Sequence, residues 1–184
     1  MKTLFCLLLC TVAMAVNAQT SLNDMLKQQM VKDWERAKLY TDEYLEAMPA
    51  DNYSFRATDS VRTFAQQMLH LTVANAGLLY AIGARDPIQN KILTRDLERT
   101  ATAQTKDSVV YFVNGSYDLV INAIKNMDFT KLDEVVSFQM PGGNRSETRL
   151  AWLLKAFEHQ THHRGQCTVY IRLVGLRPPA EKLF

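Results

Sequence analysis

Three of the chain's 4 histidines fall within residues 158–166, and two of these, His159 and His163, are four residues apart. In an α-helix, residues with this spacing project from the same face, one turn apart. Two imidazoles placed in this way can bind one metal ion together. This pair is the strongest indication of chemistry in the sequence.

The pattern around the pair predicts that both rings face the inside of the protein. A last helix is expected from Glu147 to about Val174, with Ser146 as its N-cap and Gly175 at its end. One stripe of this helix follows alternating spacings of four and three, as the inward face of a helical bundle does. A buried ring nitrogen without a partner costs about 1–3 kcal/mol, and a shared metal ion would satisfy several of them. The stripe consists of Trp152, Ala156, His159, His163, Gln166 and Tyr170.

His70 is the natural candidate for a third ligand, since an open metal site usually has three protein ligands. It lies near the middle of a predicted second helix, among small or polar residues that leave space around an ion. A lone core histidine is more often hydrogen-bonded to a carbonyl group, so both interpretations stay open at this point. His162 is rotated by about 100° from His163 and is expected to face another helix or solvent. Gln166 is a candidate for orienting a bound water, or else for bridging two helices.

Helical periodicity dominates the chain and predicts an all-α protein, a four-helix bundle with a short connecting helix and loops. Gly115, within the third long helix, indicates close packing. We expect Arg164 to pair with an acidic residue and Cys167 and Tyr170 to be structural.

The helical pattern also predicts where each element begins and ends. The expected elements are a first helix from Thr20 or Ser21 to Met48, a second capped by Thr58 or Asp59 and ending near Ile82, a short helix over 88–97, a third long helix over 104–127, an extended piece at Val135, Val136 and Phe138, a turn over 141–144, and the last helix.

The first eighteen residues are typical of a secretory signal peptide. Lys2 is followed by an apolar run from Leu4 to Val16 and by a small-residue cleavage site that ends at Ala18. The mature domain is then residues 19–184, exported to the periplasm. Of the 3 cysteines only Cys167 would remain, so the domain must rely on its hydrophobic core. No later segment is apolar enough to cross a membrane.

Charge excludes one class of partner. The formal net charge is +2 and becomes +1 when Lys2 is removed with the leader, so nothing indicates a nucleic-acid partner. A small-molecule substrate and no membrane partner are expected for the mature form. An apolar helix face, common in bundles of this kind, is compatible with a homodimer.

Two longer segments resemble a known group of proteins. Residues 159–179, with the motif His163-Arg164-Gly165-Gln166, are similar to the C-terminal signature of the DinB/YfiT-like superfamily, whose members are described as metalloenzymes. Residues 53–70, which end at His70, resemble the loop and second helix of the same superfamily. The resemblance extends from about residue 22 to residue 179. It implies a four-helix bundle that binds one divalent metal ion through His70, His159 and His163.

The resemblance also implies the kind of chemistry. Characterised relatives include thiol-dependent S-transferases and a thiol-dependent isomerase, whose thiol cofactors are cytoplasmic. Because this chain is expected to be exported, the metal site is the property that carries over rather than the thiol reaction. We therefore expect hydrolysis or group transfer on a small molecule, with zinc, nickel, copper or iron activating a bound water or thiol. The alternative is a non-catalytic, metal- or ligand-binding bundle with a stress-related role.

Overall fold

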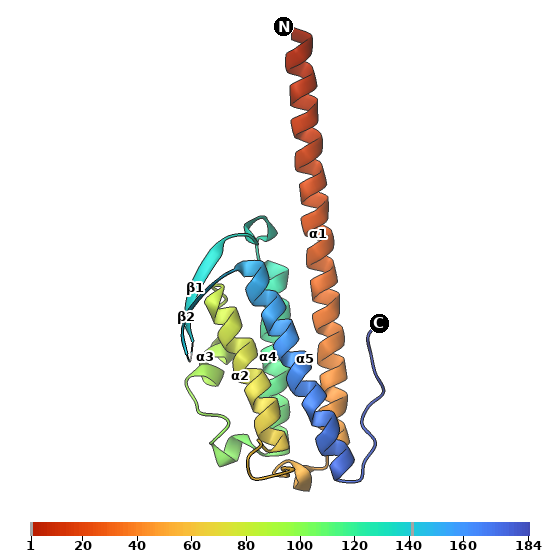
Figure 1. The fold of residues 1–184 in the computed structure, drawn as a ribbon, viewed down its shortest axis with the longest axis vertical. Coiled ribbons are helices and arrows are strands. Elements are labelled where there is room, and N and C mark those ends of the chain that lie inside the picture. Colours follow the sequence, from red (N-terminus) through yellow and green to blue (C-terminus); the bar gives the residue numbers. More distant parts are fainter. Residues whose placement is uncertain (1, 141) are drawn as a thin grey trace.

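Four long helices form a bundle, as the sequence predicted (Figure 1). The computed structural model describes the backbone of residues 2–140 and 142–184 and the side chains of residues 22–140 and 142–184. Each long helix packs against two others, in the cyclic order α1, α4, α2, α5, so that α2 and α5 are direct neighbours. The long helices are α1 (Lys2–Ala47), α2 (Phe64–Ala81), α4 (Lys106–Asn126) and α5 (Arg149–Leu173). Single turns of 3-10 helix lie at η1 (Ala50–Asn52), η2 (Ala101–Ala103) and η3 (Phe129–Lys131).

Helix α1 begins earlier than expected, at Lys2 rather than at Thr20 or Ser21. No glycine or proline precedes Pro49 in the sequence, so no residue of the helix-breaking kind interrupts it. The predicted signal peptide, residues 1–18, lies outside the residues whose side chains are described, and it stays a prediction. Within the described part of the chain, none of the helices combines the length and the apolar character that a membrane span requires.

Helix α2 begins later than expected, because Thr63 rather than Thr58 or Asp59 is its N-cap. Thr63 and Gln66 form a capping box: the Thr63 hydroxyl accepts from the Gln66 backbone N–H, and the Gln66 side chain accepts from the Thr63 N–H. The aromatic ring of Phe64 packs edge-on against Tyr53, with centroids 5.1 Å apart. The residues before Thr63 therefore form a loop that folds back onto the start of the helix.

A β-hairpin precedes α5 and moves the start of that helix. The expected extended piece is strand β1 (Val135–Met140), and its antiparallel partner β2 (Gly143–Thr148) was not predicted. Ser146 was expected to cap the last helix, but it lies in β2 opposite Ser137. Thr148 caps α5 instead, accepting a hydrogen bond from the Ala151 N–H.

The short connecting helix is α3 (Pro87–Leu93), which begins after Asp86 as N-cap and is shorter than the expected 88–97. It crosses α4 closely: a Cβ atom added to Gly115 would lie 2.9 Å from Cγ1 of Ile88. The close packing predicted from Gly115 is thus confirmed.

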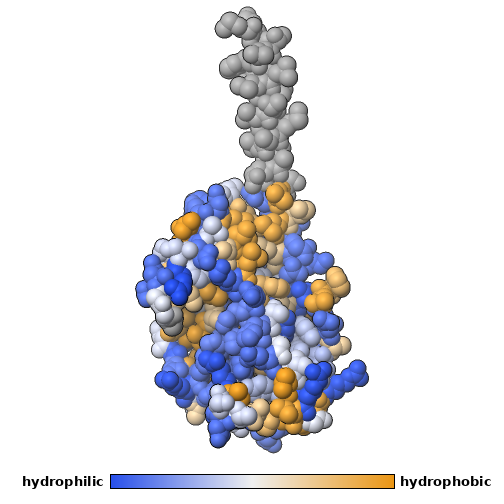
Figure 2. All heavy atoms as spheres, in the orientation of Figure 1, coloured by the Kyte–Doolittle hydropathy of each residue, from blue (hydrophilic) through white to orange (hydrophobic). Residues whose placement is uncertain are grey.

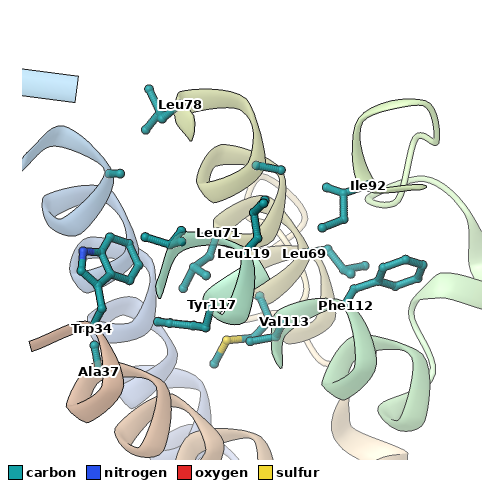
Figure 3. Packing of buried hydrophobic residues seen from close by; sticks show 14 of the residues in the cluster. Trp34, Ala37, Leu69, Leu71, Leu78, Ile92, Phe112, Val113, Tyr117 and Leu119 are labelled. Carbon is teal, nitrogen blue, oxygen red and sulfur yellow. The ribbon is translucent and has the colours of Figure 1, made fainter. Parts of the chain in front are cut away.

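The core lies between the four helices, and Figure 3 shows part of it, including Trp34 and Tyr117. Trp34 is 1% exposed and makes edge-on contacts with Tyr117 and Phe157, at centroid distances of 5.7 and 5.4 Å. Leu69 and Leu71 of α2 are fully buried among the same helices. Because Leu69 directly precedes His70, the packing of α2 fixes the direction of that histidine.

The surface is mostly hydrophilic on the face shown in Figure 2, with apolar patches near the described start of α1. A cavity of about 580 Å³ lies there and is apolar in character. Its lining includes Leu22, Met25 and Leu26 of α1 together with Leu132 and Leu150.

Candidate metal centre

The three histidines singled out from the sequence meet between α2 and α5. His70 comes from α2, and His159 and His163 come from successive turns of α5. One nitrogen atom of each ring lies within 4.8 Å of a nitrogen of the other two. The ring centroids are 5.2 Å apart for His70 and His159, 4.7 Å for His70 and His163, and 4.4 Å for His159 and His163. Three imidazoles at these separations could hold one metal ion.

Glu98 orients the first ring. Its Oε1 lies 2.7 Å from Nδ1 of His70, and its Oε2 accepts a hydrogen bond of 2.7 Å from Nε of Arg62. A neutral His70 that donates its Nδ1 proton to this carboxylate has its Nε2 lone pair free, which is the arrangement that metal-ligating histidines usually have. Burial alone would raise the pKa of Glu98, but the hydrogen bonds from His70 and Arg62 outweigh it and lower the pKa to about 2. The carboxylate is therefore ionised throughout the physiological range.

Glu98 was not predicted, because it lies in the loop between α3 and η2, far from the histidines in the sequence. Its position is well fixed. The preceding residue, Leu97, is 1% exposed, and the backbone oxygen of Glu98 accepts hydrogen bonds from the side-chain amides of Gln66 and Gln104, at 3.0 and 2.9 Å. The loop thus places the Glu98 carboxylate beside Nδ1 of His70.

Gln67 orients the third ring. Its Oε1 lies 2.7 Å from Nδ1 of His163, and its Nε2 donates to the hydroxyl oxygen of Tyr170 over 3.4 Å. The Tyr170 hydroxyl in turn donates to the backbone oxygen of Arg62, at 2.6 Å. A chain of hydrogen bonds therefore connects His163 to the residue that precedes the cap of α2. Tyr170, expected to be a core residue, is buried as predicted and also belongs to this chain.

The second ring has an unused nitrogen. Nδ1 of His159 is buried and has no hydrogen-bond partner among the described residues. A buried nitrogen without a partner is costly, so the site fits an additional group that bonds to this ring. The donor set agrees, since neutral imidazoles are common ligands of divalent transition metals.

The protonation of the rings also suits a metal. Burial, followed by the neighbouring histidines, lowers the pKa of His159 to about 4 and that of His163 to about 3. The positive charge of Arg62 lowers both values further. Both rings are therefore neutral at pH 7, as metal ligation requires.

The side chain of Gln166 contacts the fourth histidine, His162. Its Nε2 lies 2.9 Å from Nε2 of His162, on the exposed side of α5. His162 itself is exposed, as its rotation around the helix predicted. The glutamine that contacts a clustered imidazole is Gln67 on α2. The role considered for Gln166, the orientation of a bound water, stays a prediction.

Arg164 also differs from expectation. It was expected to pair with an acidic residue, but it is 6% exposed and donates to Oε1 of Gln160 over 2.7 Å. Its guanidinium lies over the ring of Tyr40, 4.7 Å from the centroid, and Gln160 also accepts from the hydroxyl of Tyr117 over 2.8 Å. This buried network ties α5 to α1 and α4 and so fixes the rotation of α5 that turns its histidines toward α2. Cys167 is fully buried, and burial raises the pKa of its thiol.

Most of the chain matches a known protein family in sequence. The family model described as the DinB family matches residues 14–183. The chain is 23% identical, over 149 residues, to the uncharacterized protein YjoA of Bacillus subtilis (strain 168), covering 80% of this chain and 90% of that protein.

Solved structures resemble the fold at low sequence identity. A DinB-like protein from Bacillus cereus ATCC 10987 is 18% identical with a TM-score of 0.69, covering 84% of this chain and 97% of that one. The structure of YjoA from Bacillus subtilis is 19% identical with a TM-score of 0.61, over 85% and 96% of the two chains. A conserved protein from Enterococcus faecalis is 16% identical with a TM-score of 0.62, over 80% and 95%.

Proposed function

Since the chain belongs to the DinB family, we propose that it is a divalent-metal-dependent hydrolase or group transferase that acts on a small molecule, with His70, His159 and His163 as the metal ligands. One observation carries the proposal: nitrogens of three imidazoles, from two helices, lie within 4.8 Å of one another. Nδ1 of His159 is buried and has no hydrogen-bond partner among the described residues, which supports the proposal because a further group can bond to this ring.

The surrounding residues would act as positioning groups. Glu98 holds the ring of His70, and Gln67 holds the ring of His163, each through Nδ1 at 2.7 Å. A divalent ion held by the three histidines would lower the pKa of a water or thiol bound to it and so supply a nucleophile near neutral pH. The side chains of His70 and Glu98 are 28% and 25% exposed, so a small molecule can approach from their side. All-imidazole ligation suits zinc, nickel, copper or iron.

We also propose the cellular location that the sequence predicts. The protein would be exported, lose residues 1–18, and act in the periplasm without a nucleic-acid or membrane partner. Mass spectrometry of the protein recovered from the periplasm tests this: a first residue of Gln19 supports the proposal, and an intact residue 1 contradicts it. Light scattering of the same sample measures whether the mature protein is a homodimer.

Elemental analysis tests the metal site. Wild-type protein should contain about one equivalent of a divalent metal, and His70→Ala, His159→Ala and His163→Ala should each lose most of it. His162→Ala is the matched control, because His162 lies on the same helix but is exposed outside the group. Undiminished metal in His163→Ala would contradict the assignment.

An activity screen separates the proposed enzyme from the non-catalytic alternative. Metal-replete protein is assayed with esters, amides, and pairs of an electrophile and a thiol, with and without a chelator. Sustained turnover that the chelator abolishes supports the enzyme. Stoichiometric metal without turnover on any of these classes supports a binding protein with a stress-related role.

A further inference from the structure

A guanidinium group lies at the edge of the three-histidine group and contacts Glu98 rather than any of the rings. Arg62 uses Nε to donate to Oε2 of Glu98, while the other oxygen of the same carboxylate holds His70. The guanidinium and the imidazole are therefore separated by a single carboxylate group. The Arg62 side chain is 41% exposed, so it lies at the solvent side of the site.

The position of Arg62 is fixed at both ends. Its backbone oxygen accepts the Tyr170 hydroxyl at 2.6 Å, and the next residue, Thr63, is the N-cap of α2. Its side chain is held by Glu98 at 2.7 Å. A flexible surface arginine would lose much conformational freedom on binding a ligand, whereas this one is already ordered.

The guanidinium retains unused donors. Arginine has five N–H groups, and among the described residues Arg62 donates only from Nε. Its Nη groups are free of protein partners within that part of the chain. Two parallel N–H groups match the two oxygens of a carboxylate, which they can bind in bidentate fashion.

The charge of the site favours an anion. An imidazole that binds a metal ion is neutral, and Glu98 offsets the charge of Arg62, so a bound divalent ion would leave the site with an excess of about two positive charges. A neutral ligand would leave that excess uncompensated in a partly buried place. A ligand that presents one anionic group to the ion and another to Arg62 would neutralise it.

We infer that Arg62 is the substrate-recognition residue of this site and that it binds a carboxylate group of a small-molecule substrate beside the metal centre. This inference rests on the proposed function, since it takes the three-histidine group as the reacting site. It names the substrate class, a small carboxylic acid anion, and a residue outside the ligand set that selects it.

The test uses zinc-loaded full-length protein and calorimetric titration with succinate, and with succinamate as the probe that has one carboxylate fewer. Wild type should bind succinate, and Arg62→Gln should weaken that binding about ten- to one-hundredfold, the loss expected for hydrogen bonds to a charged group. Arg62→Lys should recover only part of the loss, because an ammonium cannot bind a carboxylate in bidentate fashion. Succinamate should bind wild type more weakly than succinate does, and Arg62→Gln should reduce the affinity for succinamate less than the affinity for succinate.

Arg145→Gln is the matched control. Arg145 is exposed on the hairpin, and within the described residues its hydrogen bond is to the backbone oxygen of Asn144, so succinate affinity should not change. Zinc content, measured on every sample, separates the two proposals. If wild type binds no zinc, the proposed function fails, and this inference fails with it. If zinc is bound but succinate does not bind, or binds equally well to Arg62→Gln, only the inference is overturned.

Discussion

Replacing Glu98 by glutamine should weaken metal binding without touching a metal ligand. Glu98→Gln keeps the size of the side chain and removes the charge that faces Nδ1 of His70 at 2.7 Å. The carboxylate stabilises positive charge on the ring and fixes its tautomer, and both effects strengthen the bond that the other nitrogen makes to a metal ion. The amide provides one oxygen acceptor, but it must serve His70 and Arg62 in place of two charged oxygens.

The size of the effect follows from the environment of the pair. Removing such a partner costs about 10- to 100-fold in metal affinity, equal to about 1.4–2.8 kcal/mol at 1.4 kcal/mol per tenfold. The Glu98 side chain is 25% exposed, so solvent screens it only in part. The loss of Glu98 also leaves Arg62 without its partner, and the unpaired positive charge then opposes the ion. We therefore expect at least about a tenfold rise in the zinc dissociation constant.

The assay is competition for zinc with a chromophoric chelator at pH 7. Glu134→Gln is the control, because the Glu134 carboxylate pairs with Arg149 near the start of α5, at 3.0 Å, rather than with a clustered histidine. Its zinc affinity should equal that of wild type. A dissociation constant for Glu98→Gln within twofold of wild type would refute the role given to Glu98.

Three further changes test the fold and the state of the rings. Burial lowers the pKa of His159 to about 4 and that of His163 to about 3, from 6.5 in the unfolded chain. Below about pH 6.5 the unfolded chain therefore binds more protons than the folded protein does, until the folded rings titrate as well. The unfolding free energy of the metal-free protein should therefore fall as the pH is lowered from 7 toward 4, and fall less in His163→Gln, as measured by urea denaturation. Leu69→Ala, at a fully buried position, should lower the unfolding free energy by about 2–5 kcal/mol in the same assay. Gly115→Leu should lower it by about 1–3 kcal/mol, because the new side chain would overlap Ile88, and an unchanged midpoint would show that α3 does not pack as described.

The inward stripe of α5 could be predicted from the sequence because it depends on local spacing alone. The spacing that includes Trp152, His159 and His163 is set by helix geometry, and the structure buries Trp152 and brings the two histidines together with His70. Helix ends were less predictable, since several residues can cap. Thr63 rather than Thr58 or Asp59 caps α2, where Phe64 packs on Tyr53. Thr148 caps α5 because Ser146 is paired within the hairpin.

The residues that support the rings could not be predicted from the sequence, because they are set by contacts between distant segments. Glu98, which contacts His70, comes from a loop, and Gln67, which contacts His163, comes from the neighbouring helix α2. Spacing along α5 pointed to Gln166, yet its amide is turned to His162. The pairing of β1 with β2 was missed for the same reason, since the sequence of β2 is polar and offers no apolar alternation.

The most direct measurement of the central claim is the position of the ion itself. Crystals of zinc-loaded protein would be measured at the zinc absorption edge, and an anomalous difference map would locate the metal without reference to the protein. We predict one peak per chain, at about 2.0–2.1 Å from a nitrogen of each of His70, His159 and His163. A peak elsewhere on the chain, or bonded to only one of these rings, would contradict the three-histidine centre.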